Sequence, residues 1–455
     1  MYKKGYFTLG NIYNIGKNKY IFIFSGEQYN IFFHTMKKTE KYKIKFSILF
    51  EWYFLFFSLY SAIIHSYYFS QMSSKKFSLP IILLTILLDI IGFGLIIPSL
   101  PFIIRGFGLG EHWVGITFAT FSIGMFLGGI VFGRLSDMYG RKHILMMTSF
   151  LNMIGYIFFA FAGNIWFFMF ARFLSGLGGA GMAIGQAYIS DISTPGDRTK
   201  NLGMTGAMFG IGFTIGPVLG GLFGNGSHLI LGLAAAVIIF LNFLIIAFFL
   251  PDIKNKHLEV SEESVSPMDF HHHKKQIYIL FTLTFLLSIG FSAMQTTFPL
   301  LLADRFSFHE KEIGYLFGFI GIIAIIYQGF LIKYVRKILD ERGMILFGFS
   351  ALILSFSLFA VNPFFLGIFV IALFPLGQGS INPAIGSLHA HYAGKEVGKA
   401  LGTNASMLSL GNIVGPFLAG YFYLIWNGAP YIVASIFFLI AFLFVFFGLR
   451  NVEKR

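Results

Sequence analysis

Two charged residues, Asp89 and Arg172, lie deep within apolar stretches of this 455-residue sequence. At about 1.5 Å per helical residue, Asp89 would sit ~13 Å from one end of its stretch, and Arg172 ~11 Å from the opposite end of its own. In a hydrocarbon core of ~30 Å their depths would differ by only ~6 Å, which is within reach of an arginine. Isolated charges at such a depth are costly, so both should face an aqueous cavity or each other.

The chemistry open to such a carboxyl group is proton transfer. Burial without an adjacent cation favours the protonated form, and the group can then take up and release a proton. The alternative is a static ion pair that fixes one helix against another. We expect Asp89 to carry a proton and Arg172 to belong to the proton or substrate pathway.

The second half of the sequence offers amides instead of charges within its apolar stretches. We expect three glutamines to line a polar pathway beside aromatic and methionine side chains: Gln295, Gln328 and Gln378. Asn404 and Asn412 share this character. For each amide the alternative is a hydrogen bond between helices. This difference between the halves predicts that the second half binds the substrate and moves, while the first half takes up and releases the proton.

Twelve apolar stretches of about 20 residues follow Pro80, each long enough to cross a bilayer as a helix. They lie near 80–104, 113–134, 143–162, 165–190, 201–223, 227–250, 276–303, 313–334, 344–361, 364–388, 398–423 and 428–449. The sequence therefore predicts an all-α membrane protein with twelve transmembrane helices in two six-helix bundles. The predicted bundles are 72–251 and 276–455, joined by a polar cytoplasmic linker at 252–275.

The composition agrees with a membrane protein, because 56% of the residues are hydrophobic and 12% are charged, against about 25% charged in soluble domains. The net charge of +13 lies in clusters between apolar runs, which indicates cytoplasmic loops and not a nucleic-acid surface. After Met72, one set of predicted loops and ends carries 20 Lys and Arg residues, and the other carries only Arg105, Arg305 and Lys311. Both termini are therefore expected in the cytoplasm of a multi-pass protein of the cell (cytoplasmic or inner) membrane.

Residues 1–71 differ from the rest, with nine lysines and then an aromatic run. We interpret this extension either as an interfacial segment or as sequence upstream of a start at Met72, where Met-Ser-Ser-Lys-Lys precedes an apolar run.

The two halves repeat each other at an offset of 198 or 199 residues. Gly115 corresponds to Gly314, Gly178 to Gly377 and Pro217 to Pro416 at 199, and Gly92-Phe93 corresponds to Gly290-Phe291 at 198. Six helices per half is an even number, so the repeats are parallel and related by an axis along the membrane normal. Repeats of this kind are typical of transporters whose site lies between the halves.

A glycine stripe marks the fifth predicted helix of each half. Residues four apart fall on one face of a helix, and small residues there let helices pack closely in lipid. We expect this role for Gly203, Gly212, Gly216, Pro217, Gly220 and Gly221, and for their copies Gly411, Gly415, Pro416 and Gly420.

A second motif occupies the predicted cytoplasmic connection between the second and third helices. We expect five of its residues to contribute to gating and to contact between the bundles: Gly133, Asp137, Gly140, Arg141 and Lys142. Asp191 ends the fourth helix at the same face and is the expected partner of Arg141. Glycines permit a tight turn, and Asp137 can accept from a helix N-terminus.

These motifs resemble those of the major facilitator superfamily, and within it the drug:proton antiporters and tetracycline-resistance efflux proteins. Gly133 to Lys142 resembles the family's loop between helices 2 and 3, and Gly203 to Gly221 resembles its helix 5 motif associated with antiport. The helix 4 motif of this branch is matched by Arg172 with Gly176, Gly178 and Gly181. Its helix 1 motif is matched by Leu88-Asp89 with Gly92, Gly94, Pro98 and Pro101.

The resemblance implies a pore between two bundles, alternating access by rocking, and export driven by proton entry. It further implies that Asp137 anchors the cytoplasmic contact between the bundles and that Arg172 is linked to proton handling. The second half departs from the pattern, because Lys333 to Gly343 lacks the glycine spacing. It also has no predicted intramembrane carboxylate, so we expect a general amphipathic drug as the substrate.

The sequence thus predicts a proton-coupled secondary active transporter that exports small amphipathic organic compounds. The alternative is a proton-coupled transporter of a metabolite such as a sugar, an amino acid or a siderophore; a membrane sensor or scaffold is a further one. An enzyme is not expected, since no nucleophile–base arrangement appears. No cofactor site is expected, because the G-x-G-x-x-G match from Gly176 to Gly181 lies within an apolar helix. No metal site is expected either. The expected partners are the lipid bilayer, protons and a small organic substrate, with no nucleic acid, and a monomer is expected.

Overall fold

The computed structural model describes residues 8–15, 18–24, 77–194, 196–224, 227–253, 273–361, 367–393 and 397–449. The chain divides into two units, Met1–His65 and Ser66–Arg455. In the first unit, β1 (Thr8–Ile15) and β2 (Asn18–Phe24) form an antiparallel ribbon, with Thr8 opposite Phe24 and Ile15 opposite Asn18. The expected all-α fold did not include this ribbon. Apart from this ribbon, the extension at 1–71 lies outside the described residues, as does most of the predicted linker.

The second unit is helical, and its first six spans alternate in direction. They are α2 (Ser78–Ile96), which continues through η3 (Ile97–Ser99) into α3 (Leu100–Gly106), then α4 (His112–Tyr139), α5 (Arg141–Ala160), α6 (Ile165–Gly179) with α7 (Gly181–Ile192), α8 (Arg198–Phe223) and α9 (His228–Phe249).

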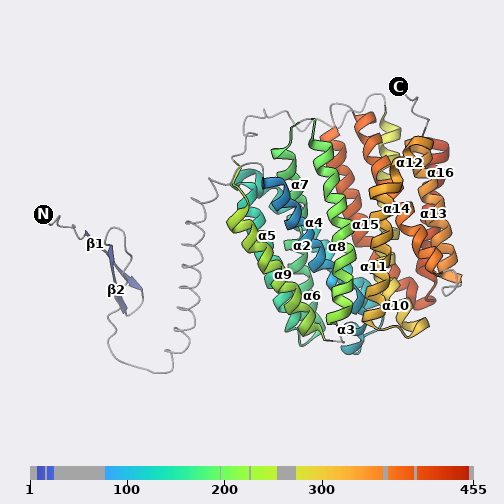
Figure 1. Ribbon diagram of the computed structural model, residues 1–455. Coiled ribbons are helices and arrows are strands. Elements are labelled where there is room, and N and C mark those ends of the chain that lie inside the picture. Colours follow the sequence, from blue (N-terminus) through green and yellow to red (C-terminus); the bar gives the residue numbers. More distant parts are fainter. Residues whose placement is uncertain are drawn as a thin grey trace. The chain divides into compact units, whose positions relative to one another are not determined.

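Six further spans repeat the arrangement. They are α10 (Lys274–Phe306), α11 (Glu310–Ile326) with η5 (Tyr327–Leu331) and α12 (Ile332–Ile338), α13 (Glu341–Val361), α14 (Gly367–Ala393), α15 (Val397–Ile425) and α16 (Ala429–Gly448). In Figure 1 the helices of the two halves stand side by side.

Length and hydropathy make eleven of these twelve spans candidates for crossing a membrane among the described residues, and α14 is the remaining one. Many large apolar side chains are exposed on them, such as Val237, Phe249 and Phe447. Such a surface needs lipid around it. The predicted twelve-helix, two-bundle fold is therefore confirmed, with helix ends within a few residues of the predicted ones.

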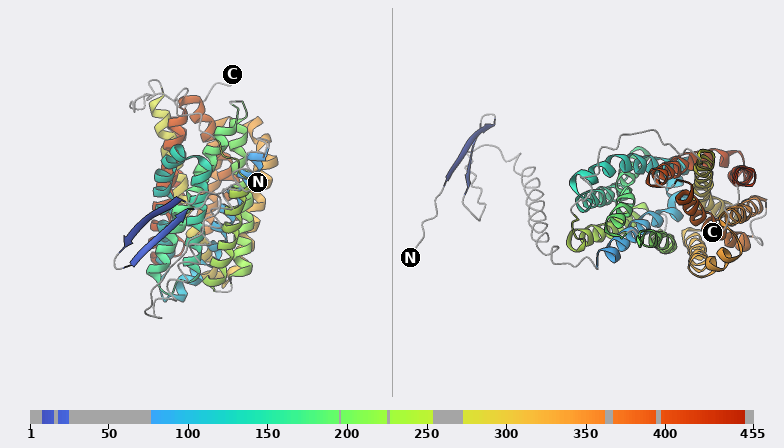
Figure 2. Two further views of the ribbon diagram at one scale, coloured as in Figure 1. Left: turned by 90° about the vertical axis from the view of Figure 1, so that its left-hand side faces the viewer. Right: turned by 90° about the horizontal axis from the view of Figure 1, so that it is seen from above.

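The C-terminal ends of α3, α5, α8, α10, α13 and α15 lie at one end of the helical unit, called the Arg105 end. Those of α4, α7, α9, α12 and α14 lie at the other, called the Gly140 end. Seen along the helices in Figure 2, the two halves form neighbouring groups. The first half packs α2 on α8, and the second packs α10 on α15. The halves meet where α4 packs on α15 and α8 on α11.

The connection between the second and third spans is shorter than predicted. Residues 133–139 are the last turns of α4, and only Gly140 separates α4 from α5. Gly140 has φ 94°, a conformation that glycine adopts without the steric cost of a Cβ. A methyl group added at Gly133 would meet no atom within 4 Å. Gly140 alone therefore makes the turn, which corrects the expectation that both glycines do.

Candidate functional site

The glycine stripe of α8 packs against α2. A Cβ at Gly212 would lie 2.8 Å from Ile90 Cγ2, one at Gly216 would lie 2.8 Å from the Ile91 carbonyl, and one at Gly220 only 1.9 Å from the Leu95 carbonyl. The copy in α15 packs against α10 in the same way, because a Cβ at Gly411 or Gly415 would overlap Ser288 Oγ or Ser292 Oγ. Each half is therefore held together by backbones in direct contact.

A second glycine contact joins the two halves and occurs twice. A Cβ at Gly115 of α4 would lie 2.2 Å from the carbonyl oxygen of Pro416 on α15. A Cβ at Gly314 of α11 would lie 2.5 Å from the carbonyl oxygen of Pro217 on α8. Gly420 extends the first contact toward the Arg105 end, where it faces His112 of α4. Gly221 extends the second in the same way, where it faces Glu310 of α11. The equivalent residues of both repeats thus form equivalent interfaces between the halves.

Glycines of the same helices nearer the Gly140 end have open surroundings. A methyl group at Gly203 or Gly206 of α8, or at Gly402 of α15, would meet nothing within 4 Å. The expected close packing at Gly203 is therefore wrong, since no described residue comes within 4 Å of a Cβ there in this conformation. Among the described residues, the close glycine contacts between the halves thus lie toward the Arg105 end of α8 and α15, while Gly203, Gly206 and Gly402 near the Gly140 end make none.

Asp89 lies in α2 and is held by amides from two other helices. Asn242 of α9 donates from Nδ2 to Asp89 Oδ1 at 3.1 Å, and the side chain of Asn152 of α5 also hydrogen-bonds Asp89. Asn242 is fully buried and Asn152 is nearly so, while Asp89 keeps partial exposure. The second carboxylate oxygen faces Gly181, where a Cβ would stand 3.4 Å from it.

This arrangement can hold Asp89 with or without a proton. The amide nitrogens stabilise the carboxylate, while the carbonyl oxygens of both asparagines, Oδ1 in each case, are buried without a hydrogen-bond partner among the described residues. A flipped amide would present its oxygen to the hydroxyl of a protonated Asp89. The cluster is therefore suited to a carboxyl group that changes protonation.

Arg172 lies in α6 and does not form an ion pair with Asp89. Its guanidinium stacks on the ring of Phe121, with Cζ 4.6 Å from the centroid. The side chain is 1% exposed, and its Nε and Nη1 atoms find no hydrogen-bond partner in the part of the chain that the structure describes. Tyr156, equally buried, lies within electrostatic reach of both Arg172 and Asp89. The alternative of a static Asp89–Arg172 pair is therefore wrong in this conformation.

At the Gly140 end, Arg141 holds three side chains together. Its Nε donates to Asp191 Oδ2 at 2.9 Å, Nη1 to Ser136 Oγ at 2.6 Å, and Nη2 pairs with Asp137 Oδ1 at 2.6 Å. The structure thus brings together Arg141 and Asp191 as expected. Lys142 is buried and lies within electrostatic reach of Asp252, after α9. These contacts lie within the first half, so the inter-bundle role of Asp137 stays a prediction.

The three glutamines of the predicted pathway differ in burial, and Gln328 lies beside α14, because a Cβ at Gly379 would stand 3.1 Å from its Cγ. Gln295 on α10 is buried, Gln328 on η5 is exposed, and Gln378 on α14 is half-buried. Sequence reasoning also overlooked that the helices extend past the predicted stretches, so that Asp304, Glu310 and Glu341 belong to their end turns.

A polar cluster in the second half was missed by the sequence analysis. His389 of α14 is fully buried, and its Nε2 lies 3.0 Å from Asn404 Oδ1, which also accepts from Thr284 Oγ1 at 2.6 Å. A histidine at the end of the apolar stretch 364–388 was the available signal. Nearby along α14, Ser380 hydrogen-bonds Tyr327 at the π-helical turn η5.

Aromatic rings connect the first half to the second. Phe93, beside Phe121, and Phe291 occupy equivalent positions of the two repeats. Phe291 reaches Phe213 of α8 at 6.0 Å between centroids and stacks on Phe374 of α14 at 5.9 Å. These rings offer an apolar contact surface close to Gln295, one helical turn along α10.

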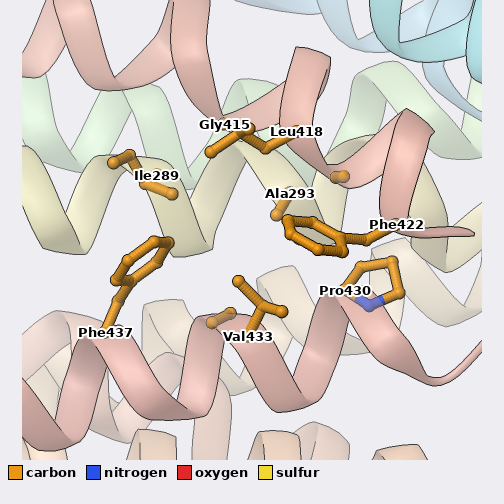
Figure 3. A pocket seen from close by; sticks show the side chains of 10 residues that line it. Ile289, Ala293, Gly415, Leu418, Phe422, Pro430, Val433 and Phe437 are labelled. Carbon is orange, nitrogen blue, oxygen red and sulfur yellow. The ribbon is translucent and has the colours of Figure 1, made fainter.

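A small pocket between α10, α15 and α16 is a poor candidate for the site. Figure 3 shows Ile289, Phe422 and Phe437 around it, and all ten lining residues are apolar or glycine. Without a polar group it cannot orient a substrate. The Asp89 cluster is therefore the candidate site.

At the Arg105 end, charged side chains connect the halves. Arg105 of α3 forms an ion pair with Asp304 of α10. Glu111 lies 3.4 Å from Arg105, and Tyr423 donates its hydroxyl to Asp304 Oδ2 at 2.7 Å.

The Major Facilitator Superfamily matches residues 82–396 and 341–455 of the sequence. The chain belongs to the Major Facilitator Superfamily. Its curated relatives include the tetracycline resistance protein, class H, of Pasteurella multocida, which is 28% identical over 396 residues, 83% of this chain and 98% of that protein. Multidrug resistance protein 2 of Bacillus subtilis (strain 168) is 29% identical over 357 residues, 77% of this chain and 89% of that protein.

A solved facilitator shares the fold. The crystal structure of a D-xylose–proton symporter aligns with a TM-score of 0.68 at 14% identity, covering 84% of this chain and all of that one. The family resemblance predicted from the motifs is confirmed. This facilitator is a multi-pass membrane transporter of small molecules and not an enzyme.

Proposed function

We propose that this facilitator exports small amphipathic organic compounds in exchange for protons. The observation that carries the proposal is Asp89, a carboxyl group inside the first half that is held by two amides and has no cation beside it among the described residues. The names of the relatives, a tetracycline resistance protein and a multidrug resistance protein, support export of such compounds.

The proposed transport uses alternating access between the two halves. In support, the glycine contacts between α4 and α15 and between α8 and α11 lie toward the Arg105 end, while Gly203 and Gly402 near the Gly140 end are open. Equivalent interfaces on both sides of the repeat axis allow the halves to rock against each other. We assign the present conformation to the state that is closed at the Arg105 end.

We infer that the Gly140 end faces the cytoplasm. Lys and Arg residues gather there, including Arg134, Arg141, Lys333 and Arg336, and cytoplasmic loops carry such an excess. Both termini would then be cytoplasmic. One chain supplies both halves of the transport path, so a monomer is the expected functional unit.

In the proposed cycle, Asp89 alternates between two protonation states. When the Arg105 end is open, Asp89 takes a proton from outside, and when the Gly140 end is open it releases the proton inward. The aromatic rings of Phe93 and Phe291 and the amide of Gln295 would contact an amphipathic substrate. Tyr156, which lies within electrostatic reach of both Asp89 and Arg172, would couple the charge on Asp89 to Arg172 and so to the helix packing.

The test is transport by the purified protein in proteoliposomes that contain a pH-sensitive dye. Amphipathic cations, tetracycline and metabolites such as sugars and amino acids are added in turn, with empty liposomes as the control. We expect protons to move only when an amphipathic drug is present. Proton movement with a sugar or amino acid alone would replace the proposal with the metabolite-transporter alternative.

A further inference from the structure

Arg105 of α3 and Asp304 of α10 belong to different halves and meet at the Arg105 end. The offset of 198 residues that relates Gly92-Phe93 to Gly290-Phe291 pairs Arg105 with Ala303, so Asp304 follows the repeat equivalent of Arg105 by one residue. In a two-fold arrangement, residues this close to equivalence meet only near the axis. The opposite charges of Arg105 and Asp304 attract the two halves to each other at this point.

Each member of the pair is supported by its own half. Glu111, in the connection before α4, lies beside Arg105, and Tyr423 of α15 donates to Asp304. The neighbouring cation Arg305 does not compete for Asp304, because it bonds to Asn427 at 2.6 Å and to the Ala360 carbonyl within the second half. The contact between the halves at this point is therefore specific to Arg105 and Asp304.

The ion pair and the glycine interfaces depend on the same closure. The Gly115–Pro416 and Gly314–Pro217 contacts require the helix backbones to touch. Rocking that opened the Arg105 end would separate these backbones and would also pull Arg105 from Asp304. The side chains of Arg105 and Asp304 are 36% and 27% exposed in the pair. Water can therefore solvate both charges when the pair breaks.

We propose that Arg105 and Asp304, supported by Glu111 and Tyr423, form an electrostatic latch that favours the conformation closed at the Arg105 end. The inference rests on the alternating access proposed above. An exposed ion pair of this kind shifts an equilibrium by about fivefold or less. Such a latch biases the two conformations without trapping either one, as a transporter requires. Because its two members face each other across the halves, their charges can be exchanged.

The test measures the two conformations directly, by electron–electron distance measurements between spin labels. The chain has no cysteine, so labels can be attached at introduced cysteines without further changes. Gly163→Cys and Val361→Cys report on the Arg105 end, and Met138→Cys and Ile338→Cys report on the Gly140 end. All four positions are exposed, with one of each pair in each half.

Each label pair is combined with Arg105→Gln, with Asp304→Asn, or with the exchange Arg105→Asp and Asp304→Arg together. Lys311→Gln is the matched control, because Lys311 is an exposed cation at the same end without an ion-pair partner among the described residues. Measurements are made without substrate or gradient, so they do not depend on which compound is transported.

The latch predicts that each neutralised variant raises the ratio of open to closed molecules at the Arg105 end by about threefold to fivefold. The distances at the Gly140 end should shorten in the same molecules. The charge exchange should return the ratio to within about twofold of the parent, and Lys311→Gln should leave it unchanged. Restoration by the exchange also excludes misfolding as the cause of the single-variant effect.

Unchanged distances in both neutralised variants would overturn the latch, and so would an exchange variant as open as the single ones. These outcomes are separate from those of the transport test. A latch that responds as expected in a protein that moves no proton with any drug would leave the latch standing and reject the proposed antiport.

Discussion

Asn242 of α9 donates a hydrogen bond across the first half to the carboxylate of Asp89 on α2, over 3.1 Å. Asn242 is fully buried, and its Nδ2 also reaches the Thr85 carbonyl at 3.3 Å. A buried donor in this position fixes both the rotamer of Asp89 and the spacing of α2 and α9. The proposed proton site is thus built from three helices of one half and not from the interface between halves.

Replacing Asn242 by leucine should impair proton-coupled transport. The ionised form of Asp89 would lose a hydrogen bond to a charged group, which is worth about 1.5–3 kcal/mol. We expect drug-dependent proton flux to fall by about tenfold or more. The control is a double-mutant cycle with Asp89→Asn, in which Asn242→Leu should add no further loss. An equal additional loss in that background would show that Asn242 acts independently of Asp89.

Gly115→Ala should prevent closure at the Arg105 end, because the new methyl group would lie 2.2 Å from the Pro416 carbonyl. Gly314→Ala should do the same against Pro217. Transport rates in proteoliposomes should fall by about tenfold or more for either variant, since each removes one of the alternating states. Gly129→Ala, on the same helix as Gly115, meets nothing within 4 Å and should transport normally. Normal transport by Gly115→Ala would contradict the closed interface.

Arg172→Met should raise the thermal stability of the protein and lower its transport activity. A buried cation without an acidic partner costs free energy, and an apolar residue of similar volume removes that cost. The loss of the cation–π contact with Phe121 offsets only part of the gain. We expect the melting temperature in detergent to rise by a few degrees, as for a gain of about 1 kcal/mol, while proton-coupled flux falls. A lower melting temperature would mean that Arg172 has a stabilising partner.

Arg141→Lys should destabilise the Gly140 end nearly as much as Arg141→Ala. Three nitrogens of the guanidinium each serve a different acceptor, on Asp191, Ser136 and Asp137. The single ammonium of lysine cannot reproduce this fork. Thermal unfolding should show a loss of about 1–3 kcal/mol for both variants. A lysine variant as stable as the parent would indicate that charge alone holds this network.

The sequence was sufficient for the fold because hydropathy sets the length of a membrane helix. The twelve stretches, the repeat and the stripe from Gly212 to Gly220 all follow from one-dimensional patterns. The partner of Arg141 also followed, because loop order places Asp191 at the same end.

The site was less predictable, because the rotation of a helix about its axis decides which side chains meet. Asp89 and Arg172 have similar depths, yet Asp89 meets Asn242 and Asn152 while Arg172 meets Phe121. No spacing pattern announces an asparagine as the partner of a distant acid. The open surroundings of Gly203 depend on the conformation of the transporter, which a sequence does not specify.

The pH dependence of drug export by Asp89→Asn tests whether Asp89 carries the proton. Purified parent and variant are reconstituted side by side, and export is measured over a range of external pH with and without a proton gradient. We expect the gradient to drive export by the parent, whereas the variant exchanges drug across the membrane without a response to the gradient. A variant that exports at the rate of the parent, with the same pH dependence, would show that Asp89 does not carry the proton.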